Sequence, residues 1–222
     1  MRDPMTNRAA PVFCDDRGWI VNVYEWEDTH YCFYNGLGGV KAKGKWGFID
    51  KEGRFVIPCR WDWARNFTDS LAPVKDGNKW GCIDRTGALV IPCRWDEIGR
   101  FTDGIAPVKD GDKWGYIDRT GTLVIPPQWE QAGPFLPGIG NYAVVRKNGL
   151  YGLIAPLGKP VIPCRWQFIG YYYEKRWIMV CNDRSGPRQF WVWHHYDLET
   201  GQTLEAMNND EDGYGRDLID VL

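Results

Sequence analysis

The chain has few of the residue types and motifs on which enzymes and nucleic-acid-binding proteins depend. Its 222 residues include three histidines, and the short motifs of zinc proteases, serine hydrolases and nucleotide-binding loops do not occur. The formal net charge is −2, whereas a general nucleic-acid-binding protein normally has a strong basic surplus. We therefore expect no catalytic activity, no cofactor and no nucleic-acid partner.

Long apolar stretches are also absent. No run of residues is long and apolar enough to span a membrane. Residues 1–11 contain Arg2, Asp3 and Arg8 and lack the apolar core of a signal peptide. These observations predict a cytoplasmic protein that does not use a membrane as a partner.

Cysteine is present, but not in the pattern of a disulfide framework or a metal site. The count of seven is odd, so a complete set of intramolecular disulfides is impossible. Cys59, Cys93 and Cys164 each precede an Arg-Trp pair, and none belongs to the close C-x-x-C spacing of a typical zinc site. We predict reduced thiols that serve packing, and no bound metal.

What the chain does contain is a repeat. The pattern W-G-x-I-D-x-x-G-x-x-V-I-P begins at Trp46, Trp80 and Trp114, 34 residues apart, and a modified copy begins at Tyr151 after a three-residue insertion. Each copy continues with a second tryptophan. A connecting segment, which we call the crossing, follows and carries an aromatic residue, and a short apolar run ends the copy. A fixed period indicates one structural unit that is stacked several times.

The ends of the chain resemble weaker copies of the same unit, as expected for outer repeats that face water on one side. We count about five full units and a terminal half unit. The repeat crosses the middle of the chain without a linker, which predicts a single repeat domain over residues 12–205. An N-terminal arm, residues 1–11, and an acidic tail, residues 206–222, flank it.

The units resemble the bacterial WG repeat family, which is named for the Trp-Gly pair present here at residues 46–47, 80–81 and 114–115. The resemblance covers roughly residues 12–205. It implies an all-β repeat fold and a binding or scaffolding role, and it implies no enzymatic activity at any position of this chain.

The residues independently indicate β-structure. Aromatic and β-branched residues dominate the regular segments, and Gly, Pro, Asp and Asn separate them at short spacing. In the turn after each W-G strand, such as Asp84 to Gly87, the Asp carboxylate can accept hydrogen bonds from backbone N–H groups, and the Gly supplies a positive φ. The Pro that ends each V-I-P run should terminate strand pairing.

One unit is therefore predicted to hold about three antiparallel strands, and stacked units would bury their apolar faces on one another. The predicted fold class is all-β, with tandem antiparallel repeats of about 34 residues. An open, twisted array is favoured over a closed, propeller-like ring because the end copies are incomplete.

Thirteen tryptophans require an explanation. Those of the W-G pairs are predicted to be core residues whose N–H groups find a carbonyl. The tryptophans of the R-W-[DE] motif have two interpretations. Core packing is one; the other follows from their charged neighbours, which make Trp61 and Trp95, with Arg60 and Arg94, candidates for partner-binding anchors at the surface. The alternative is a purely structural row of ion pairs between these arginines and the following acids. Five tryptophans lie outside the pattern and are better candidates for a specific role: Trp19, Trp26, Trp63, Trp177 and Trp191.

The region 171–192 departs most from the repeat and could serve capping, partner binding or both. Its candidate partner-binding residues are Tyr172, Tyr173, Trp177, Arg184, Arg188 and Trp191. The acidic tail that follows is either a linker that folds back on the last repeat or a short segment that docks on a partner.

Two functional hypotheses follow from these features. The preferred one is a non-catalytic module that binds a bacterial protein through a rigid β surface, as an adaptor, immunity or defence-associated protein. The alternative is binding of a glycan or cell-wall polymer by exposed aromatic rings, which requires tryptophans that water can reach. A structural spacer is a third, less favoured possibility.

Overall fold

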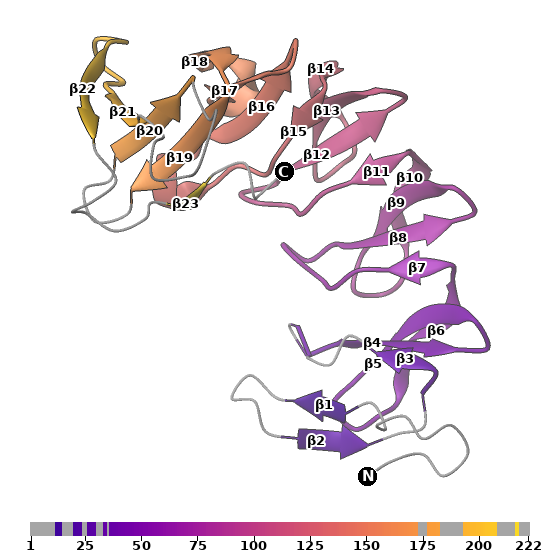
Figure 1. Cartoon of the computed structure of the whole chain (residues 1–222). Coiled ribbons are helices and arrows are strands. Elements are labelled where there is room, and N and C mark those ends of the chain that lie inside the picture. The colour runs from indigo at the N-terminus through magenta and orange to yellow at the C-terminus, as the bar shows by residue number, and fades with distance from the viewer. Residues whose placement is uncertain are drawn as a thin grey trace. The chain divides into compact units, whose positions relative to one another are not determined.

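The computed structural model describes residues 12–14, 20–23, 26–29, 33–34, 36–172, 177–182, 193–207 and 216–217. Its regular structure there is β-strand throughout, apart from two short 3-10 turns, η1 (Pro137–Ile139) and η2 (Pro156–Gly158). The predicted all-β repeat fold is therefore confirmed (Figure 1). In the part of the chain that is described, no helix has the length and apolar character needed to cross a membrane.

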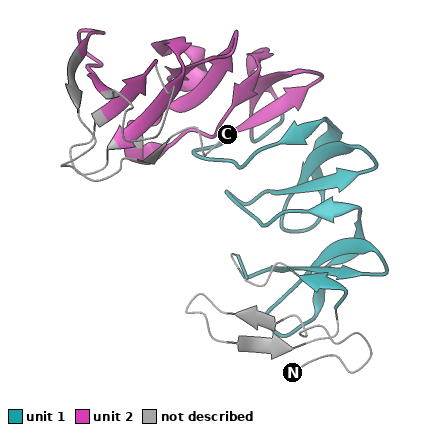
Figure 2. Ribbon diagram, in the orientation of Figure 1, with its two compact units in different colours: residues 1–104, 119–121 teal, residues 105–118, 122–222 magenta. Residues whose placement is uncertain are grey.

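The chain divides into two compact units, which are coloured separately in Figure 2. Unit 1 contains residues 1–104 and 119–121, and unit 2 contains residues 105–118 and 122–222. The single repeat domain expected for residues 12–205 stays a prediction.

Unit 1 consists of antiparallel strands that pair mainly with their neighbours in the chain. Strands β1 (Val12–Cys14) and β2 (Ile20–Val23) form a pair, and two four-stranded sheets follow. The strands of these sheets, in order, are β3 (Asp28–Thr29), β4 (Gly38–Ala42), β5 (Lys45–Ile49) and β6 (Phe55–Trp61), then β7 (Trp63–Ala64), β8 (Ala72–Asp76), β9 (Lys79–Ile83) and β10 (Leu89–Trp95). Strand β11 (Glu97–Ile98) comes next in the chain.

Unit 2 continues the same plan. In chain order, β12 (Ile105–Asp110), β13 (Lys113–Asp118) and β14 (Leu123–Trp129) pair, and so do β15 (Gln131–Ala132), β16 (Ala143–Lys147), β17 (Leu150–Ile154) and β18 (Pro160–Trp166). The last sheet has the order β22-β21-β20-β19-β23. Its strands are β19 (Phe168–Tyr172), β20 (Trp177–Cys181), β21 (Trp193–Tyr196), β22 (Thr203–Met207) and β23 (Arg216–Asp217). Part of the predicted acidic tail is thus a strand, β23, which pairs with β19.

Each repeat contributes the three strands expected from the sequence and one more. The additional strand is very short and lies in the crossing that follows the second tryptophan, as β7 and β15 do. The predicted turn chemistry is confirmed at Asp84, whose Oδ1 accepts hydrogen bonds from the backbone N–H groups of Thr86 at 2.8 Å and Ala88 at 3.0 Å. Gly87 in the same turn has a φ of +86°, which only glycine adopts without strain.

The prediction that strand pairing stops at the V-I-P proline is wrong. Strand β6 runs past Pro58 to Trp61, and its pairing with β5 shifts register between the pairs Phe48↔Ile57 and Trp46↔Trp61. From one pair to the other, β6 advances by four residues while β5 advances by two. The proline therefore lies in a bulge, where its missing N–H breaks no ladder hydrogen bond.

The bulge explains why Gly must follow Trp in the W-G pair. A Cβ atom on Gly47 would lie 2.6 Å from the carbonyl oxygen of Ile57 and 2.7 Å from the backbone nitrogen of Cys59. Both atoms belong to the bulged backbone of β6, which cannot move away as a flexible side chain could. Gly81, Gly115 and Gly152 meet the same contact in their own repeats.

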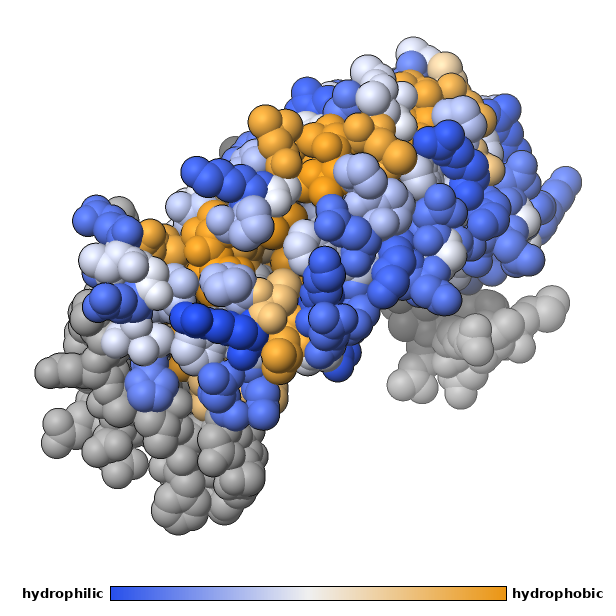
Figure 3. Space-filling view, turned by 90° about the horizontal axis from the view of Figure 1, so that it is seen from above, coloured by the Kyte–Doolittle hydropathy of each residue, from blue (hydrophilic) through white to orange (hydrophobic). Residues whose placement is uncertain are grey.

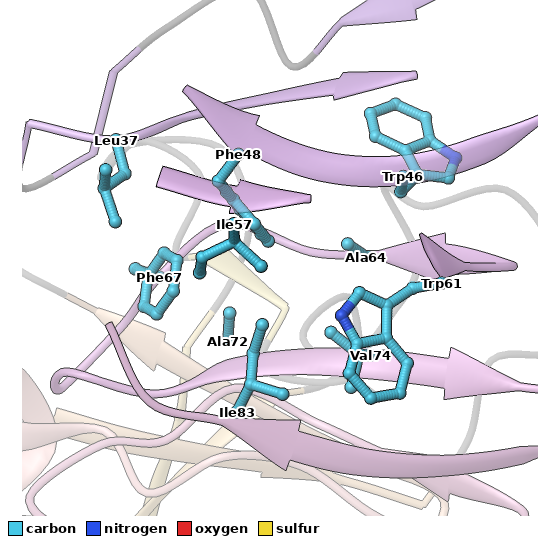
Figure 4. Packing of buried hydrophobic residues seen from close by; sticks show 10 residues of the cluster. All are labelled: Leu37, Trp46, Phe48, Ile57, Trp61, Ala64, Phe67, Ala72, Val74 and Ile83. Atoms are coloured by element: carbon cyan, nitrogen blue, oxygen red, sulfur yellow. The ribbon is translucent and has the colours of Figure 1, made fainter. Parts of the chain in front are cut away.

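The core forms between consecutive sheets, as the stacking argument predicts. In Figure 4, Phe48 of β5 and Ile57 of β6 pack against residues of the next sheet in unit 1. These residues are Phe67, in the segment between β7 and β8, and Ile83 of β9. The ring centroids of Phe48 and Phe67 are 4.8 Å apart in an edge-to-face arrangement, the geometry that aromatic pairs prefer. No single sheet could bury these side chains alone.

Candidate binding groove

Trp61 and Trp95 are core residues rather than surface anchors. Their exposed fractions are 5% and 3%, which agrees with the core-packing interpretation. The placement near the surface inferred from their charged neighbours is wrong. The strand alternates, and it places the ring inside while the flanking side chains point outward. The indole N–H groups of both rings have no hydrogen-bond partner among the described residues.

Arg60 and Arg94 cover these buried rings. Each guanidinium carbon lies 4.3 Å from the centroid of the tryptophan that follows it, Trp61 or Trp95, which is a cation–π geometry. Arg60 also donates a hydrogen bond of 3.2 Å to the carbonyl of Gly87 in the next repeat. The two arginines therefore have a packing role that the sequence did not indicate.

The acids of the R-W-[DE] motif contact lysines and turns instead of these arginines. Asp96 forms an ion pair of 2.7 Å with Lys79. Asp62 accepts a hydrogen bond from Lys45 and another, of 2.7 Å, from the backbone N–H of Gly77. The hydrogen bond from Lys45, followed by the one from Gly77, lowers the pKa of the Asp62 carboxyl. These contacts replace the hypothesis of a row of arginine–acid pairs. Asp62 and Asp96 pair with the lysine that begins β5 or β9, and Asp62 also binds the turn between β8 and β9.

The C-terminal candidates are only partly within the described residues. Tyr172 and Trp177 lie on β19 and β20 and are paired in register, and only their backbones are described. Tyr173, Arg184, Arg188 and Trp191 lie outside the described residues. The proposed role of all six stays a prediction.

The repeated cysteines, Cys59, Cys93 and Cys164, are free thiols that are partly buried. The Sγ of Cys59 donates to the carbonyl of Val40 at 3.7 Å, and burial raises the pKa of Cys59, Cys93 and Cys164. Burial also raises the pKa of the Cys82 thiol to about 12. Among the residues with a described position, no three His, Cys, Asp or Glu side chains converge as metal ligands would.

Unit 1 has a groove on its surface, formed by two consecutive repeats. It encloses about 410 Å³ and is lined by Trp63, Ala64, Arg65, Asn66, Thr68, Pro73, Gly99 and Arg100. Strand β7 and the crossing after it form one wall, and the residues after β11 form the other. A volume of this size accommodates a few side chains.

Trp63 is the aromatic element of this groove. It is 46% exposed, and its ring lies against that of Trp46, with centroids 5.4 Å apart and an interplanar angle of 50°. Trp46 is fully buried in the core, so it supports the exposed ring from below. A tryptophan held in this way presents a large apolar surface with little loss of conformational entropy on binding.

Arg65 provides a positioned charge. Its Nη1 donates a hydrogen bond of 2.6 Å to the carbonyl of Ile98, and its guanidinium lies 4.5 Å from the centroid of the Trp80 ring. Burial of the Arg65 guanidinium lowers its pKa through desolvation. An arginine nevertheless stays protonated in proteins. The side chain bridges two repeats and keeps its charge at the groove.

Other polar groups of the groove have unused hydrogen-bonding capacity. Within the described part of the chain, neither the exposed Arg100 guanidinium nor the Asn66 amide has a hydrogen bond or ion pair. The hydroxyl oxygen of Thr68 is buried and lacks a partner among the same residues. A buried polar group without a partner, such as the Thr68 hydroxyl, requires an explanation, and a bound ligand or water is one.

The groove residues were largely missed by sequence reasoning, although one signal was present. The sequence shows that Trp63 lies outside the repeat pattern, but the predicted partner-binding residues do not include it. The corresponding positions of the next two units hold Glu97 and Gln131, and the position of Arg65 holds Gly99 and Gly133. A comparison of the repeats for departures in charge and aromaticity could have singled out Trp63 and Arg65, but not the groove that they line with residues of the next repeat.

Exposed apolar residues also occur at the start of the V-I-P strands. They are Phe55, Val56, Leu89, Val90 and Leu123. In the face shown in Figure 3, apolar residues gather in patches bordered by hydrophilic ones. These positions are scattered over the repeats, whereas the groove residues lie together around one cavity.

The fold defines an all-β repeat protein, and comparison with known families agrees with the repeat. The sequence pattern of the family described as "WG containing repeat" matches residues 46–80, 80–114, 114–151 and 151–184. These matches cover more than half of the chain, which therefore belongs to the WG repeat family.

No curated protein matches the sequence. Among solved structures, "KlHsv2 with loop 6CD replaced by a Gly-Ser linker" has a TM-score of 0.50 at 9% identity, covering 87% of this chain and 74% of that one. Hsv2 of "Kluyvelomyces marxianus" has a TM-score of 0.45 at 8% identity, with coverage of 94% and 67%. A protein of unknown function from Bacteroides caccae has a TM-score of 0.30 at 15% identity, with coverage of 79% and 72%. At such identities the likeness to the first structure concerns the fold alone.

Proposed function

We propose that this protein is a non-catalytic module that binds a bacterial protein partner through the groove of unit 1. The observation that carries the proposal is the exposed Trp63 ring, which lines the groove together with two arginines, Arg65 and Arg100, and the Asn66 amide. Tryptophan and arginine are the residues most often found as energetic anchors at protein interfaces. The rigid sheet stack would act sterically, by covering the working surface of its partner.

The burial of the repeated tryptophans favours a protein partner over a glycan. Polysaccharide binding along the array would need a series of rings that water can reach, but Trp61, Trp95, Trp129 and Trp166 are all buried. The acids of the repeat turns are also engaged structurally, as Asp84 is by two backbone N–H groups, which leaves them poorly suited to act as a catalytic pair. This supports the non-catalytic part of the proposal.

A cytoplasmic location is part of the same proposal. Cys59, Cys82, Cys93 and Cys164 are free thiols in the described structure, and free thiols suit a reducing compartment. Fractionation of the native host would test this point.

The test of the proposed function is capture of the partner by the full-length, tagged chain from its native host. We expect one protein to be recovered in near-equimolar amount, and Trp63→Ala to reduce its recovery about tenfold because the ring is an anchor. Phe55→Ala is the matched control, since Phe55 is 51% exposed, lies in the same unit and is outside the groove. Absence of a stoichiometric protein, or full recovery with Trp63→Ala, would contradict the proposal.

A further inference from the structure

The charge of the groove indicates the chemistry of its ligand. Two of its lining residues are arginines, Arg65 and Arg100, and none is acidic. The chain as a whole is close to neutral, with a net charge of −2, so the two arginines give the groove a local positive character. Such a site favours an anionic ligand.

The two arginines have different roles. Arg65 is held by the Ile98 carbonyl and the Trp80 ring, so it supplies a fixed positive potential. Arg100 is exposed and has no ion pair with a described residue, so its planar guanidinium is available for a bidentate contact. Such a fork matches the two oxygens of a carboxylate.

The remaining groups of the groove suit a peptide better than an isolated anion. The exposed face of Trp63 requires an apolar or aromatic group for full complementarity. The Asn66 amide has both a donor and an acceptor, as does each peptide unit of an extended chain. The volume of about 410 Å³ is in the range of small-ligand sites, which suits a short segment better than a folded element.

Resting on the proposed function, we propose that the groove binds an acidic segment of the partner in which a carboxylate side chain lies next to a large apolar or aromatic one. Arg100 binds the carboxylate, Trp63 packs against the apolar side chain, and Arg65 adds a fixed positive charge. Asn66 hydrogen-bonds to the backbone of the bound segment. The pairing of charge with aromatic contact gives specificity, because neither group alone would satisfy the groove.

The probe for this inference is a fluorescently labelled, flexible peptide with a central Asp-Phe-Glu sequence between Gly-Ser linkers, titrated with the full-length protein and followed by anisotropy. We expect saturable binding that weakens as salt is added. Peptides with central Asn-Phe-Gln or Asp-Ala-Glu sequences should each bind about tenfold more weakly, since each loses one of the two contacts.

Variants of the protein locate the site. Arg100→Gln and Trp63→Ala should each weaken binding of the Asp-Phe-Glu peptide about tenfold. Arg54→Gln is the matched control, because Arg54 is also an exposed arginine of unit 1 and pairs with Asp50 and Glu52 outside the groove. Its removal changes the net charge equally and should leave the affinity unchanged.

Three results would overturn the inference: no saturable binding of the Asp-Phe-Glu peptide, equal binding of the Asn-Phe-Gln peptide, or an equal loss with Arg54→Gln. The last result would indicate a general charge effect. These failures differ from failure of the proposed function. If Trp63→Ala abolishes capture of the native partner while the acidic peptide does not bind, the groove is an interface but its ligand is not an acidic segment.

Discussion

At the scale of single residues, Ser70 stands in a backbone conformation that its side chain disfavours. Thr68 and Leu71 close a two-residue turn through reciprocal backbone hydrogen bonds of 2.9 and 3.0 Å. Asp69 and Ser70, between them, have φ values of +50° and +68°. In the next repeat the position of Ser70 is occupied by Gly104, which adopts a φ of +80° without strain.

Ser70→Gly should therefore stabilise the protein. The left-handed conformation costs a non-glycine residue roughly 1–2 kcal/mol, and the greater freedom of glycine in the unfolded chain offsets part of the gain. We expect the free energy of unfolding to rise by about 0.5–1 kcal/mol, measured by urea denaturation. Ser70→Ala removes the hydroxyl but keeps the strain, so an equal gain with alanine would contradict the explanation.

A second prediction at this scale concerns the acid limb of stability. The hydrogen bond from the Thr86 hydroxyl, at 2.6 Å, and then those from backbone N–H groups lower the pKa of Asp84 below its ordinary value of 3.8. Because the folded-state pKa is depressed, the stabilisation by Asp84 is fully present above 3.8 and is lost as the pH falls through the lowered pKa.

Asp84→Asn should destabilise the protein at neutral pH, since a neutral amide accepts these hydrogen bonds more weakly than a carboxylate does. The difference in urea midpoint between the variant and the wild type should shrink as the pH falls below 3.8. A constant difference across the whole range would show that the charge of Asp84 does not contribute.

At the scale of the structural element, the W-G strand and the V-I-P strand form one interlocked pair. The bulge around each proline brings the backbone of one strand against the glycine of the other, so the two motifs depend on each other although ten residues separate Gly81 from Ile91. The pairing of these two strands therefore depends on a close backbone contact as well as on apolar side chains.

Gly81→Ala should be severely destabilising, because its Cβ would lie 2.4 Å from the carbonyl oxygen of Ile91. We expect a loss of about 3 kcal/mol, typical of overpacking against atoms that cannot move. Gly77→Ala is the control: it adds the same methyl group in open space, at a φ of +58°, and should cost only about 1 kcal/mol. Similar losses in the two variants would disprove the close-contact explanation, and chemical denaturation measures both.

At the scale of the whole molecule, the larger core clusters of the described residues each join a sheet to its neighbour in the chain. The cluster around Ile57 contains residues of β5 and β6 together with residues of β8 and β9. Such an array has stability terms that act between nearest neighbours. Damage to one cluster should thus remain local.

Ile57→Ala tests this. Ile57 is 1% exposed, and its truncation should cost about 3 kcal/mol. Native-state hydrogen exchange should accelerate in β4 to β10 of unit 1 and remain unchanged in β16 to β18 of unit 2. Uniform acceleration throughout the chain would instead indicate one cooperative folding unit.

Much of the fold follows from local patterns. The period of 34 residues, the Asp and Gly of the turns and the β-branched runs identified the all-β repeat, because turn chemistry and strand preference act over a few neighbouring residues. The short strand in each crossing was missed, since two residues such as Trp63 and Ala64 carry no recognisable period.

What only the tertiary structure decided is which side of each strand meets the next sheet. Trp61 and Trp63 are two residues apart and both have charged neighbours, yet Trp61 is 5% exposed and Trp63 is 46% exposed. Asp62 lies at a bend between β6 and β7, and these two strands belong to different sheets. The pairing of β6 with β5 and of β7 with β8 determines that difference, and it depends on residues distant in the chain. For the same reason the groove could not be assembled from sequence: Trp63 and Arg100 come from different repeats, and only packing brings them to one surface.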